Sequence, residues 1–227
     1  MVIKLQKYKK KLVDYCKSLH RTRNVSTLRV CTMSTPTDDA PTVPLSAAVD
    51  AIVKNLGFPE ARVRTVSRAL QERGLFPMGG PRQSPMAKLE EVVTLIVGIA
   101  IDKPLHETAD RIKAFDGLRP EGMPPEDQLP PQLDRMNHSP LDMLDVIAEE
   151  LAGGDNSGRR LMIDVVAEPW PELTIRYPAG TVARYLSQGA PRGHWQARGY
   201  RKAVTLNGAA LGDVMLDLFG TEKADAA

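Results

Sequence analysis

Cysteine is almost absent from this sequence, and long apolar runs are absent altogether. The two cysteines, Cys16 and Cys31, both lie near the N-terminus, which argues against a disulfide framework and a structural zinc site. The longest apolar run, near residues 92–101, falls far short of the roughly 20 residues that a membrane-spanning helix needs. No compact apolar stretch follows the N-terminal charges, as a secretory signal would require. We therefore expect a soluble, cytoplasmic protein without membrane contact.

The residue patterns of common catalytic sites are also missing. The histidines are scattered and form no HxxxH or HExxH pair: His20, His106, His138 and His194. The nucleophile elbow, the Walker phosphate loop and the dinucleotide fingerprint are absent. Asp164 in a predicted strand, with Glu168 nearby, is the only nuclease-like feature. We predict a protein that is not an enzyme, has no catalytic residues, metal or cofactor, and works by binding other macromolecules.

The composition is otherwise that of an ordinary globular protein. Of the 227 residues, 42% are hydrophobic and 26% are charged, which suits one mid-sized domain or two small ones. Aromatic residues make up only 5% of the chain. The core must therefore be built mainly from Leu, Val, Ile and Ala.

The positive charge is concentrated at the N-terminus. Residues 1–32 carry nine Lys/Arg and one acid, Asp14, a net charge of +8, so the remaining residues carry −6 when the whole chain carries +2. The pI near 8.5 therefore belongs to one short segment and does not indicate nucleic-acid binding by the rest.

Three interpretations of residues 1–32 compete. The segment is an upstream extension of a protein that starts at Met33, a basic nucleic-acid-binding arm, or an amphipathic targeting peptide, and we favour the first. The stretch that follows, residues 34–43, is rich in Thr, Pro and Asp, so we expect residues 1–43 to be a basic and disordered N-terminal segment.

Apolar residues at helical spacing predict four helices in the next part of the chain. They are expected at Leu45–Leu56, Pro59–Arg73, Met86–Ile101 and Pro104–Phe115. The third helix is apolar almost all round, which is typical of a central core helix or of an oligomer seam. We expect a homo-oligomer with its seam around Val93 and Ile96.

The remaining chain changes from helical to strand periodicity. Residues 119–138 hold five prolines without a usable period, which predicts a linker. Ser139-Pro140 starts a further helix, and the strands and last helix are expected at Leu161–Val166, Leu173–Tyr177, Thr181–Leu186, Ala203–Leu206 and Ala209–Phe219. We therefore predict an α+β protein, with a helical domain (44–118) followed by a small antiparallel-sheet α+β domain (139–227).

The second predicted helix carries the strongest indication of function. Val63, Val66 and Leu70 fall on one face, and Arg64, Arg68 and Gln71 on the opposite one. Arginine and glutamine have forked donors that suit base edges and phosphates, and helix–Gly turn–helix is the helix-turn-helix arrangement. The predicted DNA-binding residues are Arg62, Arg64, Arg68, Gln71, Arg73 and Arg82, the last in a wing-like turn, MGGPRQSP. The alternative interpretation is an ordinary solvated helix face.

This region also resembles a known group of proteins. The run LGFPEARVRTVSRALQERGLFPMGG, followed by MAKLEEVVTLIVGIAI, resembles the N-terminal region of bacteriophage and prophage DNA-binding proteins, namely phage regulators and small terminase subunits. The resemblance covers about residues 44–115, roughly a third of the chain, and its motif is generic. It implies a helix-turn-helix domain, a helical oligomerisation segment, and a C-terminal part that meets a phage or host protein.

A second basic region lies between residues 173 and 212, which contain no Asp or Glu. Basic residues mixed with aromatics suit single-stranded nucleic acid or an acidic protein surface. The candidate patch consists of Arg192, Trp195, Arg198, Tyr200, Arg201 and Lys202. We favour the other interpretation, in which the aromatics, including Tyr177 and Tyr185, pack in the sheet and the arginines form its solvated face.

The sequence thus predicts a sequence-specific protein that binds double-stranded DNA, a transcriptional regulator of phage or prophage type. One alternative is a DNA-packaging protein similar to a small terminase. Another is a protein–protein adaptor that acts through the C-terminal α+β domain and does not bind DNA.

Overall fold

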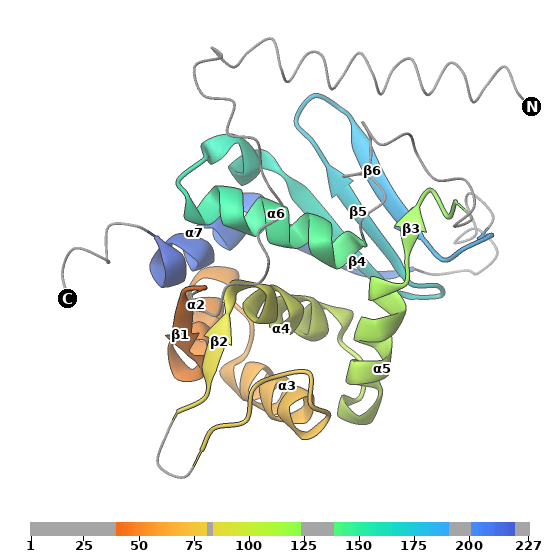
Figure 1. The fold of residues 1–227 in the computed structure, drawn as a ribbon. Coiled ribbons are helices and arrows are strands. Elements are labelled where there is room, and N and C mark those ends of the chain that lie inside the picture. The colour runs from red at the N-terminus through yellow and green to blue at the C-terminus, as the bar shows by residue number, and fades with distance from the viewer. Residues whose placement is uncertain (1–39, 81–83, 124–138, 191–200, 221–227) are drawn as a thin grey trace, which may run out of the picture. The chain divides into compact units, whose positions relative to one another are not determined.

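The computed structural model describes residues 40–80, 84–123, 139–190 and 201–220, all within the compact unit Ala40–Ala227 (Figure 1). The fold class is α+β, as the sequence predicts, with helices first along the chain and an antiparallel sheet later. In the described part of the chain, none of the helices combines the length and the apolar character that crossing a bilayer requires.

The helices of the first half lie close to their expected positions. They are α2 (Leu45–Leu56), α3 (Glu60–Glu72), α4 (Leu89–Ile101) and α5 (Leu105–Asp116). Gly57 ends α2 with φ 72°, a left-handed conformation that glycine adopts without a steric penalty. Pro59 then directly precedes α3, so α2 and α3 are separated by a short turn.

A two-stranded ribbon precedes α2 and α4. It consists of β1 (Thr42–Pro44) and β2 (Met86–Lys88), paired antiparallel. Two expectations were therefore wrong, since residues 42–43 are not disordered and residues 86–88 are not helical. The physical reason is local: prolines at 41, 44 and 85 favour extended backbone, and the Lys88 amide donates to Glu91 Oε2 at 2.6 Å, so the helix begins only after Lys88.

In the second half, an α-helix and a short 3-10 helix precede four strands, and a last α-helix follows them. Its elements are α6 (Pro140–Ala152), the 3-10 helix η2 (Asn156–Arg160), β4 (Met162–Glu168), β5 (Glu172–Arg176), β6 (Val182–Leu186), β7 (Lys202–Asn207) and α7 (Gly208–Phe219). Ser139 caps α6 as predicted, because its Oγ accepts from the Asp142 amide at 3.2 Å while the Asp142 carboxylate accepts from the Ser139 amide.

The sheet has the strand order β3-β6-β5-β4-β7, with every neighbouring pair antiparallel. Its edge strand β3 (Arg119–Pro120) pairs with β6, so the first residues of the predicted linker 119–138 form a strand. Proline fits there because an edge strand leaves one side of its backbone without a partner strand. Residues 124–138 lie outside the described residues.

Helix α4 lies at the centre of the core. It packs against α3, α5, α6, β4 and β7, and Val93 and Ile96 are buried within this single chain. The predicted oligomer seam at these two residues is therefore wrong. Its helix is apolar all round because other elements of the same chain surround it.

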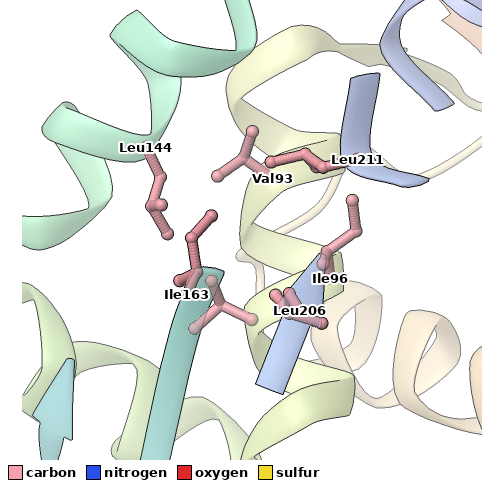
Figure 2. Close-up of a pocket in the computed structure, with 7 residues that line it drawn as sticks. Val93, Ile96, Leu144, Ile163, Leu206 and Leu211 are labelled. Carbon is pink, nitrogen blue, oxygen red and sulfur yellow. The ribbon is translucent and has the colours of Figure 1, made fainter. Parts of the chain in front are cut away.

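One face of the sheet carries this core. Ile163 of β4 and Leu206 of β7 are paired across the two strands and face Val93, Leu144 and Leu211 from α4, α6 and α7 (Figure 2). The gap between these side chains has a volume of about 10 Å³ and is lined by apolar atoms only. It is a packing defect and not a ligand site, because ligand pockets are far larger and contain polar groups.

The two halves that the sequence analysis separated at residues 119–138 share this core. A single cluster of buried side chains runs from α2 through α4 to the sheet and α7. The apolar surface of α4 needs both halves to be covered. The structure therefore places residues on both sides of the proline-rich stretch in one compact unit.

Candidate nucleic-acid interface

Helix α3 divides sharply into a buried and an exposed face. Val63, Val66, Ser67 and Leu70 are buried against α4 and α5, as the helical period predicts. The opposite face exposes Glu60, Ala61, Arg64, Thr65, Arg68 and Glu72. Since the buried side is fixed by apolar packing, the exposed side is presented on a rigid support.

The two central arginines of this face are accessible. The side chains of Arg64 and Arg68 are 57% and 80% exposed. Each forms an ion pair with a glutamate one turn away, Arg64 with Glu60 at 2.7 Å and Arg68 with Glu72 at 3.2 Å. Such pairs between exposed side chains on a helix stabilise by only about 0.3–0.5 kcal/mol, so both guanidinium groups can exchange partners readily.

Two further predicted residues lie on one flank of α3, where Arg62 contacts the turn before α5 and Arg73 contacts the first turn of α5. Arg62 Nη2 donates to the Lys103 carbonyl oxygen at 2.7 Å and lies 3.7 Å from Asp102 Oδ1, and its side chain is only 26% exposed. Arg73 Nη2 donates to the His106 carbonyl oxygen at 3.4 Å. The sequence did not show that these arginines brace α3 against the turn between α4 and α5.

Gln71 lies on the other flank, where it holds the loop that follows α3. Its Nε2 donates to the Pro77 carbonyl oxygen at 3.1 Å, and Phe76 is buried beneath the same loop. Met78, next along the loop, is highly exposed. Arg82, the predicted wing residue, lies outside the described residues. In this position Gln71 orders the loop instead of projecting from the exposed face.

The second basic patch is described only in part. Arg192, Trp195, Arg198 and Tyr200 lie outside the described residues. The structure separates the two that remain. Arg201 Nη2 donates to Glu172 Oε1 at 3.1 Å, whereas Lys202 Nζ pairs with Asp102 Oδ2 at 2.8 Å, on the turn that follows α4.

The face of the sheet opposite the helices carries a network of arginines and carboxylates. Glu172 is fully buried and contacts Arg184 Nε at 3.2 Å, and its Oε1 accepts from Thr174 Oγ1 at 2.9 Å. Asp164 accepts from Arg176 and Thr205 at 2.8 Å and 2.6 Å. These arginines satisfy buried carboxylates, as groups removed from water require.

The nuclease-like pair does not form a joint site. Asp164 is engaged by Arg176 and Thr205, while Glu168 forms an ion pair with Lys103. Within residues 40–80, 84–123, 139–190 and 201–220, no group of three His, Cys, Asp or Glu side chains could hold a metal ion.

Two of the aromatic residues, Tyr185 and Tyr177, pack in the sheet as favoured from the sequence. Tyr185 is almost fully buried, and Tyr177 packs against the core from its margin. Burial raises the pKa of the Tyr185 phenol well above its usual range, with smaller contributions from Tyr177 and Asp142. The Tyr185 ring is therefore unavailable for stacking on a nucleic-acid base.

An acidic cluster that was not predicted from the sequence lies at the junction of α4, α5 and α6. Its centre is Asp145, whose Oδ1 is buried and accepts no hydrogen bond from the described residues. Burial, followed by the nearby charges of Glu90, Asp142, Glu149 and Asp116, raises the pKa of Asp145 to about 7. The sequence does not show this cluster, because Glu90 and Asp116 belong to α4 and α5 and meet Asp145 of α6 only in the folded chain.

No protein-family model, curated protein or solved structure matches this chain.

Proposed function

We propose that this chain binds double-stranded DNA through the exposed face of α3, with α2 and α3 acting as a helix-turn-helix. The observation that carries the proposal is the arrangement of α3 itself. Its inner face is fixed in the core, while Arg64 and Arg68 project from the outer face with only weak surface ion pairs to hold them.

The shape of this face suits a major groove. An α-helix is about 10–12 Å wide with its side chains, and the groove is about 12 Å wide. Ala61 and Thr65 lie beside the arginines and are small, which lets the helix axis come close to the bases. Arg64 and Arg68 are four residues apart, about 6 Å along the helix, so they reach positions about two base pairs apart.

The energetics favour an exchange of partners on binding. Removing an arginine from a surface pair with glutamate costs about 0.3–0.5 kcal/mol, whereas a bidentate arginine–guanine contact contributes about 1–3 kcal/mol of discrimination. Glu60 and Glu72 at the two ends of the face repel phosphates. They therefore favour a docking in which the middle of α3 enters the groove.

The other predicted residues support this face in different ways. Arg62 and Arg73 brace α3 on one flank, and Gln71 orders the loop on the other. In the proposal, Arg64 and Arg68 read the bases, Arg62 and Arg73 contact the backbone, and the role is that of a phage- or prophage-type transcriptional regulator. A small-terminase-like packaging protein would use the same face.

The test is a duplex-binding titration, measured by fluorescence anisotropy over a range of salt concentrations, with the full chain. The Arg64→Ala/Arg68→Ala variant should bind the duplex much more weakly. If both lost contacts are to phosphate, the slope of log K against log salt should fall by about two; if they are to bases, sequence preference should be lost. Both side chains are exposed and lose only surface ion pairs, so the free energy of unfolding should fall by less than about 1 kcal/mol.

The matched control removes two positive charges elsewhere. Lys54 pairs with Asp217 of α7, and Arg160 is exposed at the end of η2, which packs against α7. Lys54→Ala/Arg160→Ala should bind as the unmodified chain does. Equal losses in the two double variants, or no loss in either, would refute the proposal.

One observation favours a second candidate, the protein–protein adaptor. Met162 and Val182 are exposed on the face of the sheet that carries the arginine–carboxylate network, with Arg176 on the strand between them. Exposed apolar side chains around an arginine are common in protein interfaces. If the unmodified chain binds no duplex at low salt, this face becomes the leading candidate site.

A further inference from the structure

Two basic residues that are far apart in the sequence, Arg62 and Lys202, meet at one turn of the structure. The turn is Asp102–Pro104, between α4 and α5. On one side it receives Arg62 from α3, and on the other it receives Lys202, the first residue of β7. In the sequence, Arg62 belongs to the predicted DNA-reading helix and Lys202 to a separate predicted basic patch.

Asp102 is the residue that joins them. It ends α4 in the left-handed conformation, φ 48° and ψ 47°, which places its carboxylate outside the helix. Its Oδ2 lies 2.8 Å from Lys202 Nζ, and its Oδ1 lies 3.7 Å from Arg62 Nη2. The same turn is fixed by the bond from Arg62 to the Lys103 carbonyl and by the ion pair of Lys103 with Glu168.

We propose that the duplex-binding surface continues from α3 across this turn to Lys202, so that the α+β half of the chain contributes a phosphate contact to the same duplex. In this arrangement Asp102 occupies the place of a phosphate in the unbound protein. It competes with DNA for Arg62 and Lys202. The inference rests on the proposed function of α3.

The spacing of the two cations fits a phosphate backbone. Arg62 and Lys202 lie 3.7 Å and 2.8 Å from the two oxygens of one carboxylate, so both cations are close enough to approach the same phosphate group. Arg62 lies on the flank of α3, one turn before the exposed Thr65, so a strand that lines this side of the groove would pass both Arg62 and the turn.

Accessibility distinguishes Lys202 from the other lysine of the junction. The Lys202 and Asp102 side chains are 49% and 52% exposed, whereas Lys103 is largely buried with Glu168. A hydrogen bond and the charge of Asp102 raise the pKa of Lys202, and burial and, less strongly, the nearby Arg62 oppose this rise. Lys202 is thus a charged group at the surface, and its partner Asp102 is a half-exposed carboxylate that DNA can replace.

The experiment uses the same anisotropy titrations of the full chain with a fluorescein-labelled duplex. Lys202→Ala should lower the salt slope by about one and weaken binding roughly threefold at moderate salt. Lys202→Arg should restore both values, because it retains the charge. Asp102→Asn, which keeps a residue that tolerates the left-handed conformation, should tighten binding roughly twofold to fivefold. The opposite signs of the two effects are the signature of competition.

Arg160→Ala is the matched control, since it removes one exposed charge from η2. An Arg160→Ala effect as large as that of Lys202→Ala overturns the inference, and so does a Lys202→Ala slope equal to that of the unmodified chain. If Arg64→Ala/Arg68→Ala loses binding while Lys202→Ala does not, the function of α3 stands and only the extension fails. If the α3 variant binds normally, both proposals fail.

Discussion

The buried carboxyl group of Asp145 makes a quantitative test of the packing of α6 possible. Asp145→Asn removes the charge while it keeps the shape of the side chain. Because the pKa of Asp145 is about 7 in the folded chain against 3.8 in the unfolded chain, the folded state retains a proton that the unfolded state releases between these values. The carboxyl group therefore destabilises the fold increasingly as pH rises from about 4 to 7, and by a constant amount above that.

The size of the effect follows from the same shift. About three pKa units correspond to roughly 4 kcal/mol at 1.4 kcal/mol per unit, which is the upper limit. Water entry and side-chain relaxation reduce this penalty, so we expect Asp145→Asn to raise the free energy of unfolding by about 1–3 kcal/mol at pH 8. The gain should largely disappear near pH 4, where Asp145 is protonated in both states.

Urea denaturation followed by circular dichroism at pH 4, 5.5, 7 and 8 measures the difference in unfolding free energy between Asp145→Asn and the unmodified chain. The control is Asp50→Asn, an exposed acid on α2, which should change stability by less than about 0.5 kcal/mol at each pH. The reasoning fails if Asp145→Asn is no more stable than the unmodified chain at pH 8. It also fails if the gain does not depend on pH.

Two further predictions concern the core. Val93→Asp places an unpaired charge in the core, so it should cost about 4 kcal/mol or more and abolish the cooperative urea transition. If the variant is instead a folded monomer, α4 forms an oligomer interface and not the core. Gly208→Ala should cost about 2–3 kcal/mol in the same assay, because its Cβ would lie 2.2 Å from the Gly158 carbonyl oxygen. Gly117→Ala, whose Cβ would meet only ordinary contacts from 3.5 Å, is its control, and equal losses would contradict the close approach.

The local elements of this fold were predictable because their signals are local. Gly57 and Pro59 delimit α2 and α3, and Ser139-Pro140 starts α6, each through the conformational preference of one or two residues. The alternation of Leu173 and Ile175 with polar residues likewise predicted β5, which the structure confirms. Several boundaries differ by one or two residues, and the largest difference is at Met86–Lys88, which pairs with Thr42–Pro44 and ends at the Lys88–Glu91 contact.

The relations between distant elements were not predictable in this way. The spacing of apolar residues in α4 is compatible with a core helix and with an oligomer interface. Its contacts with α6 and the sheet show that it is a core helix. For the same reason the sequence could not show that Arg62 and Lys202 approach one carboxylate, or that Asp145 is surrounded by acids of other helices. Helical period did predict that Arg64 and Arg68 are exposed, since an exposed position is a property of one helix.

The central claim is that the exposed face of α3 contacts duplex DNA, and site-specific photocrosslinking tests it most directly. A photoreactive amino acid is placed at Thr65, on the exposed face of α3, or at Val182, exposed on the sheet. Each protein is irradiated with a labelled duplex. The account predicts a protein–DNA adduct from position 65 that excess unlabelled duplex prevents, and none from position 182. An adduct from position 182 without one from position 65 would contradict it.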